Sequence, residues 1–441
     1  MTHIELKELF NESITIISSN ISQYVSDPCS DFTRARKLPP DILLSFLVSE
    51  GSSTTKNELL DFFDMDVDAP SSSAFCQQRG KLKPEGVEAL FHEFTASIDN
   101  SRPVSDYRFL AADGSTATFF SKPNYSSPEY YVDQGHSAKG FYSIHINALY
   151  DLDNHSYVDA LLQPVHEKDE FKAFTQMIDR YSSDKEKTAI FIGDRGYCSY
   201  NNMAHVIESG QYFLFRAKDI HSKGILSRFD YPKDESFDIT VKVTLVRSNS
   251  KSIQIQEGYR RFIDEASAFD YIEYGSHKTY ELSFRIVRFA LEDGSFESLV
   301  TNLPEDEFPA DRLKEIYYSR WGIETSFRKL KYTIGLSNFH SYKPEHVKQE
   351  IWARLIAHNA TETLINSVVI EKNDTKHEYA VNFSVAAHIC RIFIRTTKKE
   401  DSIDVMSLLE KELIPIRKDR RYNRLKTAHF RKPRYFIYRA S

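Results

Sequence analysis

Hydrophobic residues in the first hundred positions recur at the three- and four-residue spacing of helices. Helices are predicted over the ranges 4–26, 39–49, 55–65 and 83–98. Thr55 and Glu58 fit a capping box at the start of the third range. The N-terminal region is therefore expected to be helical, although no recognition helix for DNA can be identified in it.

From about residue 105 the apolar positions follow the two-residue period of strands. Strands are predicted in YRFLAADG, GFYSIHINALYDL, SYVDALLQPV, TAIFIGDRGY and YFLFRAK, and helices in DEFKAFTQMIDRY and NNMAHVIESG. The fourth strand is a continuous apolar run, which is typical of a strand buried on both faces. The order β-β-β-α-β-α-β indicates an α/β fold.

The segment 217–300 breaks this alternation because it is strand-like throughout. Helices resume at 310–332, and a long amphipathic helix is predicted over 345–370. We therefore expect a β-rich insertion between two parts of one α/β core.

The composition limits the class of protein. A chain of 441 residues with 41% hydrophobic content can form two or three domains, and 13% aromatic residues exclude a disordered chain. The four cysteines form no C-x-x-C pair, which argues against a zinc ribbon and a disulfide framework. The sequence has neither an apolar run of ~18 residues nor a signal peptide, so a cytoplasmic setting without membrane contact is expected.

Charge is unevenly distributed along the chain. The net charge is −6, yet residues 411–441 hold eleven Lys or Arg and two Asp or Glu, so the rest of the chain carries −15. Aromatic residues alternate with the bases of this tail, a pattern that suits contacts with nucleic acid phosphates. A solubilising tail and a surface that packs on the core or on a second subunit are alternatives.

One stretch, YYSRWGIETSFRKLKY at 317–332, places the acid Glu324 among basic and aromatic residues. At ~100° per residue, Tyr317, Arg320, Glu324 and Lys331 fall within about 60° of one another on a helix. The row borders an apolar stripe formed by Ile316, Ile323, Phe327, Leu330 and Ile334. The row is therefore expected to be half-buried. The alternative is an ordinary surface helix with the ion pairs Arg320–Glu324 and Glu324–Arg328.

Two more acids occupy comparable positions in the predicted sheet. Asp113 ends the first predicted strand and precedes a glycine, and Asp194 ends the fourth and begins DRGY. Acids at strand ends are where α/β proteins form sites. Each could also be an ordinary turn residue.

The three motifs together resemble those of DDE transposases of the insertion-sequence-four family. These are DGS at Asp113, DRGY at Asp194, and Y-x2-R-x3-E-x6-K from Tyr317 to Lys331, and every position of the last motif is filled at the family spacing. The resemblance implies a ribonuclease-H-like catalytic core interrupted by the β-rich insertion. The expected regions are a helical DNA-binding region at 1–102, core at 103–216, insertion at 217–300, core at 301–372 and a basic C-terminal region at 373–441.

The resemblance also implies a role for each motif residue. Converging carboxylates repel one another, and divalent cations remove that conflict. Oxygen ligands without nearby His or Cys favour Mg²⁺ or Mn²⁺, so two such ions are expected on Asp113, Asp194 and Glu324. The residues expected to contact DNA are Tyr317, Arg320, Lys331, Arg195 and Arg328. Trp321 could stack on a base, but a place in the core is favoured.

The implied reaction is cut-and-paste transposition. The chain would bind the terminal inverted repeats of an insertion sequence, hydrolyse a phosphodiester and transfer the strand to target DNA, as a homodimer associated with a prokaryotic nucleoid. Alternatives are a DNA-binding derivative without catalysis and a metal-dependent nuclease without strand transfer. A further alternative is a tyrosine recombinase, with His388-x-x-Arg391 and Tyr422 as its site.

Overall fold

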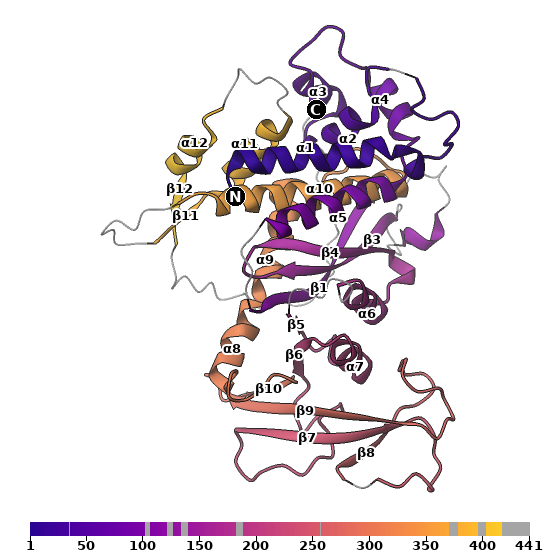
Figure 1. Ribbon diagram of the computed structural model, residues 1–441, viewed down its shortest axis with the longest axis vertical. Coiled ribbons are helices and arrows are strands. Elements are labelled where there is room, and N and C mark those ends of the chain that lie inside the picture. The colour runs from indigo at the N-terminus through magenta and orange to yellow at the C-terminus, as the bar shows by residue number, and fades with distance from the viewer. Residues whose placement is uncertain are drawn as a thin grey trace.

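The fold is a large mixed sheet with helices on both faces and a cap of helices over one end (Figure 1). The structure is a computed structural model that describes residues 1–34, 36–101, 106–120, 127–133, 140–181, 188–255, 257–369, 378–395 and 403–416. Residues 417–441, which hold most of the basic tail and Tyr422, lie outside these residues. No helix among the described residues combines the length and apolar character that a membrane crossing requires.

The N-terminal region is helical as predicted. Its α-helices are α1 (His3–Ser19), α2 (Pro40–Ser49), α3 (Thr55–Phe62), α4 (Ser72–Arg79) and α5 (Pro84–Asn100). The short α4 was not predicted. The proposed capping box of α3 is wrong, because Thr54 is the N-cap and its side chain accepts from the amide of Asn57. Glu58 instead accepts from the amide of Ser53, at 2.8 Å.

The central sheet contains the predicted strands. They are β1 (Arg108–Phe120), β3 (Phe141–Asp151), β4 (Ser156–Pro164), β5 (Ala189–Gly193) and β6 (Tyr212–Ala217), with a two-residue β2 (Tyr131–Val132) that was not predicted. Strand β1 runs antiparallel to β3 and parallel to β5, and β5 runs parallel to β6. The helices α6 (Glu170–Tyr181) and α7 (Tyr200–Glu208) connect these strands as predicted.

The strand-rich segment continues the same sheet. Its strands are β7 (Phe237–Val246), β8 (Tyr259–Phe262), β9 (Thr279–Ala290) and β10 (Phe296–Thr301). Strand β10 pairs antiparallel with β6, so the sheet order is β2-β3-β1-β5-β6-β10-β9-β7-β8 with β4 beside β3. Figure 1 shows β7, β8 and β9 at the end of the molecule opposite α1 and α5. The segment is thus joined to the core by backbone hydrogen bonds.

Two apolar clusters fill the faces of the sheet. Because side chains alternate along β1, Ala111 packs on the side of α5 and α10, whereas Leu110 and Ala112 pack on the side of α6 and α7. The helix α10 (Pro344–Asn366) lies beside α5 and is buried along most of its length. Its polar residues are inside too, so the helix predicted as amphipathic is an internal one.

The remaining described elements follow the core. They are α8 (Ala310–Ser319), α9 (Trp321–Lys329), a π-helical turn (Leu330–Ile334), α11 (Phe383–Arg395), α12 (Val405–Lys411) and a ribbon of β11 (Tyr379–Val381) and β12 (Leu413–Pro415). The helix predicted as continuous over 310–332 is therefore divided. The division falls at Arg320, whose amide bonds to the carbonyl of Tyr317, three residues back, at 3.1 Å.

Candidate active site

The first two acids are brought together by the register of two parallel strands. Ala111 of β1 pairs with Ile192 of β5. Asp113 and Asp194 each follow two residues later, so they occupy matching positions on neighbouring strands. Asp194 comes directly after the end of β5, as predicted, but Asp113 lies inside β1, which continues to Phe120. The prediction that Asp113 ends its strand is wrong.

Backbone amides orient both carboxylates. Asp113 Oδ1 accepts from the amide of Gly114 at 2.8 Å, and Asp194 Oδ1 accepts from the amide of Gly196 at 2.7 Å. A Cβ at Gly196 would stand 3.0 Å from Asp194 Oδ1, so the glycine of DRGY leaves room for the carboxylate. Tyr197 closes the turn, because its amide bonds to the carbonyl of Asp194 at 3.1 Å.

The third acid approaches from the helix α9, which packs against β1. Arg320 stands between the acids: its Nη2 lies 2.9 Å from Glu324 Oε1 and its Nη1 lies 4.0 Å from Asp113 Oδ2. The predicted pair Arg320–Glu324 is therefore present. Arg320 is 8% exposed, however, which does not fit an ordinary surface helix. Of these described residues, Glu324 and Arg328 form no ion pair with each other.

The other two acids are close enough to affect the ionisation of Asp113. Burial, together with repulsion from Asp194 and Glu324, raises the pKa of Asp113 to about 6. The amide of Gly114 and the Arg320 guanidinium oppose this shift. Within the described part of the chain, one group of possible metal ligands has atoms that all lie within 4.8 Å of one another, and it consists of Glu50, His340 and Glu350. The three acids do not meet this criterion. The triad is therefore looser than that group, with a guanidinium beside two of its members.

The other predicted site residues occupy different surroundings. Tyr317 is buried, whereas Arg195 and Arg328 are exposed. Lys331 is half-buried in the π-helical turn that Gly335 ends with a φ of +102°. Trp321 is 47% exposed, so its predicted place in the core is wrong. The guanidinium carbon of Arg320 lies 5.8 Å from the centre of the Trp321 ring system.

Three residues beside the acids were not predicted. Tyr197 is 3% exposed, and its hydroxyl makes no hydrogen bond within the described structure. Burial raises the pKa of Tyr197, and the nearby acids Asp113, Glu170 and Asp194 raise it further. His145 Nε2 lies 3.1 Å from Glu170 Oε1. Tyr197 ends the DRGY motif, whereas His145 and Glu170 come from a strand and a helix start that carry no motif. Sequence reasoning therefore had no signal for His145 and Glu170.

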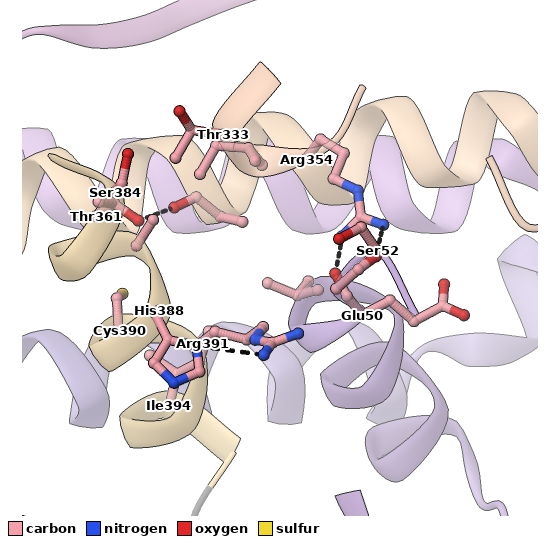
Figure 2. Close-up of a pocket in the computed structure, with 15 residues that line it drawn as sticks. Glu50, Ser52, Thr333, Arg354, Thr361, Ser384, His388, Cys390, Arg391 and Ile394 are labelled. Carbon is pink, nitrogen blue, oxygen red and sulfur yellow. Dashed lines mark hydrogen bonds between the residues drawn. The ribbon is translucent and has the colours of Figure 1, made fainter. Parts of the chain in front are cut away.

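A pocket of about 180 Å³ lies between the end of α2, α10 and α11 (Figure 2). His388 and Arg391 line it, and Arg391 Nη2 lies 3.4 Å from His388 Nδ1. The other amine, Nη1, lies 3.4 Å from Glu58 Oε2. The histidine and arginine considered for a tyrosine recombinase are thus neighbours on α11 that face a pocket lined by none of the three acids.

The span that carries all three acids matches a known family. The family model described as transposase DDE domain matches residues 104–360, more than half of the chain. The chain belongs to this transposase DDE domain family. Family membership removes the tyrosine recombinase alternative, and Asp113, Asp194 and Glu324 all lie inside the matched span.

Relatives of this DDE chain are transposases of bacterial insertion sequences. The chain is 39% identical over 67 residues to "Putative transposase InsL for insertion sequence element IS186A" of Escherichia coli K12, covering 15% of this chain and 18% of that protein. It is 41% identical over 54 residues to "Transposase InsG for insertion sequence element IS4" of the same strain, covering 12% of each. The matched segments thus span less than a fifth of these relatives.

A solved structure shows a weaker likeness to this DDE chain. It is titled "Cryo-EM structure of piggyBac transposase synaptic complex with hairpin DNA (SNHP)", with a TM-score of 0.47 and 10% identity over 91% of this chain and 83% of that chain. A TM-score of this size does not establish a shared fold.

Proposed function

We propose that the chain is a transposase of the insertion-sequence-four type, which binds terminal inverted repeats and catalyses metal-dependent phosphodiester hydrolysis and strand transfer. The observation that carries the proposal is the coupling of Asp113 with Asp194 and Glu324 inside the span matched by the DDE family. The complete Tyr317-Arg320-Glu324-Lys331 spacing supports the insertion-sequence-four assignment. The ribonuclease-H-like core is proposed on the order of β1, β3, β4 and β5, with β1 beside β5.

The donor set suits two Mg²⁺ or Mn²⁺ ions. Asp113, Asp194 and Glu324 offer only carboxylate oxygens, which these hard cations prefer. Burial is the main cause of the raised pKa of Asp113, and repulsion from Asp194 and Glu324 adds to it, so a bound cation would favour the ionised carboxylate. When bound, the ions would make an attacking water more acidic and neutralise charge on the scissile phosphate.

Residues of the chain supply positioning and further charge. Arg320 holds Glu324 through a charged hydrogen bond and so orients the carboxylate. The amides of Gly114 and Gly196 do the same for the two aspartates. Because Arg320 already bonds to Glu324, its proposed contact with DNA requires this guanidinium to reach a phosphate from a largely buried position.

The DNA surface proposed here extends outward from the acids. Arg195 follows Asp194 directly and Arg328 follows Glu324 by one helical turn, and both are exposed. Lys331 adds a third cation, and Tyr317 a hydroxyl group. The N-terminal helices are proposed to read the inverted repeat, and the transposase to act as a homodimer on two paired ends.

Strand transfer distinguishes this proposal from a nuclease. The full-length protein is incubated with a terminal-repeat duplex, a target plasmid and Mg²⁺, Mn²⁺ or EDTA. We expect joined products with either metal and none in EDTA. A matched duplex whose transferred strand ends in a 3′-deoxynucleotide should remain unjoined. Cleavage without joined products in any condition would favour the nuclease alternative, and binding without cleavage would favour a non-catalytic derivative.

A further inference from the structure

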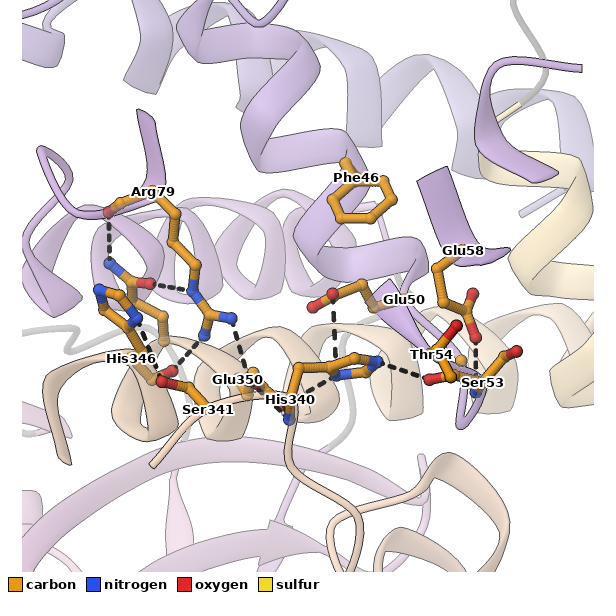
Figure 3. Close-up of polar contacts among 12 residues, drawn as sticks. Phe46, Glu50, Ser53, Thr54, Glu58, Arg79, His340, Ser341, His346 and Glu350 are labelled. Carbon is orange, nitrogen blue, oxygen red and sulfur yellow. Dashed lines mark hydrogen bonds and ion pairs between the residues drawn. The ribbon is translucent and has the colours of Figure 1, made fainter. Parts of the chain in front are cut away.

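A second group of possible metal ligands lies away from the three acids (Figure 3). It joins Glu50 at the end of α2, His340 in the segment before α10, and Glu350 on α10. Their side chains are almost completely buried, with exposed fractions of 0%, 1% and 1%. One ligand atom from each lies within 4.8 Å of the other two. The group therefore connects the N-terminal helices to the second half of the matched family span.

The spacing of the atoms is that of ligands around one ion. His340 Nδ1 lies 3.2 Å from Glu350 Oε2 and 3.7 Å from Glu50 Oε1. Ligands held at ~2.1 Å in a tetrahedron stand about 3.4 Å apart. The three atoms thus need little movement to share a cation.

Glu50 gives an independent reason to expect a ligand. Neither of its carboxylate oxygens makes a hydrogen bond within the described structure, although the side chain is fully buried. The nearby guanidinium of Arg354 bonds to the backbone carbonyls of Glu50 and Gly51 instead. A buried carboxylate without a hydrogen bond is costly unless a proton or a cation compensates it.

Neighbouring groups orient the other two ligands as in known metal sites. His340 Nε2 lies 3.1 Å from the carbonyl oxygen of Ser53, so Nε2 carries the hydrogen and Nδ1 points toward the two carboxylates. Glu350 Oε1 accepts from Arg79 Nη1 at 3.0 Å, and the backbone amide of His340 donates to both oxygens of Glu350. Arg79 is itself fixed by Gln349.

We propose that Glu50, His340 and Glu350 bind one divalent first-row transition metal ion, of the Zn²⁺ class, which fastens the N-terminal helices to α10. An imidazole ligand favours such an ion over Mg²⁺. The site is thus chemically distinct from the all-carboxylate triad. Its proposed role is structural, because the ligands are buried and come from three separate segments.

Metal content and affinity test the proposal. The full-length protein carries Asp113→Asn and Glu324→Gln, so that ions at the triad do not contribute, and is purified without chelators for elemental analysis. We expect about one transition metal ion per chain. After the metal is removed, Zn²⁺ should raise the unfolding temperature, and Co²⁺ should give the visible absorption of a low-symmetry site.

Glu50→Gln is the informative variant, because it changes the ligand whose oxygens make no hydrogen bonds. Its affinity for Zn²⁺ should fall at least tenfold. Glu58→Gln is the matched control, because Glu58 is also buried, at 3% exposed, and contacts the same loop through Ser53. Glu58 is not one of the three proposed ligands, so this variant should bind Zn²⁺ like the parent.

Two results would overturn the proposal. One is a parent protein that contains no metal and shows neither the Zn²⁺ shift nor the Co²⁺ absorption. The other is a Glu50→Gln variant that binds Zn²⁺ as tightly as the parent. Neither result depends on DNA cleavage, so failure here is distinguishable from failure of the proposed transposase function.

Discussion

The triad and the buried group use acids in opposite ways. Asp113 and Glu324 have partly exposed side chains, at 24% and 32%, and Arg320 lies beside both of them. Glu50 and Glu350 are enclosed, and Glu350 is held by Arg79. In the first arrangement one guanidinium lies beside two of the three acids. In the second, Arg79 compensates Glu350, whereas the carboxylate of Glu50 makes no hydrogen bond within the described structure. These different surroundings support the different roles proposed for the two groups of acids.

The largest expected difference is in catalysis. Asp113→Asn, Asp194→Asn and Glu324→Gln should each reduce cleavage of a terminal-repeat duplex to below about 1% of the parent rate, because each removes a proposed metal ligand. Glu350→Gln, if it folds, should retain cleavage. The measurement is single-turnover cleavage, with circular dichroism to establish folding. A triad variant that keeps more than a few per cent of the rate would not be a required ligand.

A large loss of stability is expected in the buried group. Arg79→Met leaves Glu350 without its guanidinium and should cost about 3–5 kcal/mol of unfolding free energy. Lys37→Met is the exposed counterpart, because the Lys37–Asp68 pair has exposed fractions of 60% and 84%, and it should stay within about 0.5 kcal/mol of the parent. Urea unfolding of both variants measures the contrast. Equal losses would contradict the assignment of Arg79 as a buried counter-charge.

Removing a triad acid should have the opposite effect on stability. The pKa of Asp113 is raised to about 6, so the folded protein holds this proton more tightly than the unfolded chain. Its contribution is therefore favourable below about pH 4 and is lost as the pH rises toward 6. In metal-free buffer at pH 7.5, Asp113→Asn should gain about 1–3 kcal/mol, and the gain should vanish near pH 4. A loss of stability at pH 7.5 would show that the ionised carboxylate of Asp113 does not destabilise the folded protein.

The smallest effect is expected at the guanidinium between the acids. Arg320→Ala should cost about 1–3 kcal/mol of transition-state stabilisation, the range for a lost charged hydrogen bond. Lys314→Ala, on the neighbouring helix and paired with Asp311, should cleave at the parent rate. The comparison uses kcat/KM on the same duplex. If the two variants behave alike, Arg320 has no more than the role of a surface ion pair.

Local patterns predicted most of the elements and the meeting of the acids. The apolar run of β5 and the alternation of β3 were clear in the sequence, and they place Asp113 beside Asp194 once β1 and β5 pair in parallel. The ion pair of Arg320 with Glu324 followed from helical spacing. These features depend on contacts between residues that are close in sequence, or on the register of one pair of parallel strands, β1 and β5.

Features that depend on distant partners could not be predicted. Helical periodicity predicted an amphipathic helix at α10, but its Glu350 is buried and pairs with Arg79, which lies far away in sequence. Trp321 was assigned to the core but is exposed. The pairing of β10 with β6 has no local signal at all. The proposed region boundaries and DNA contacts stay predictions.

The pairing of β6 with β10 has a consequence for synthesis of the chain. The apolar strand β6 leaves the ribosome with one edge free, and its neighbour β10 follows roughly 80 residues later. At typical elongation rates of ~5–20 residues per second, that edge waits on the order of 4–16 s for its partner. During this time Phe213 and Phe215 present a hydrophobic strand to other nascent chains. Yield of the folded protein should therefore depend on translation speed between these strands.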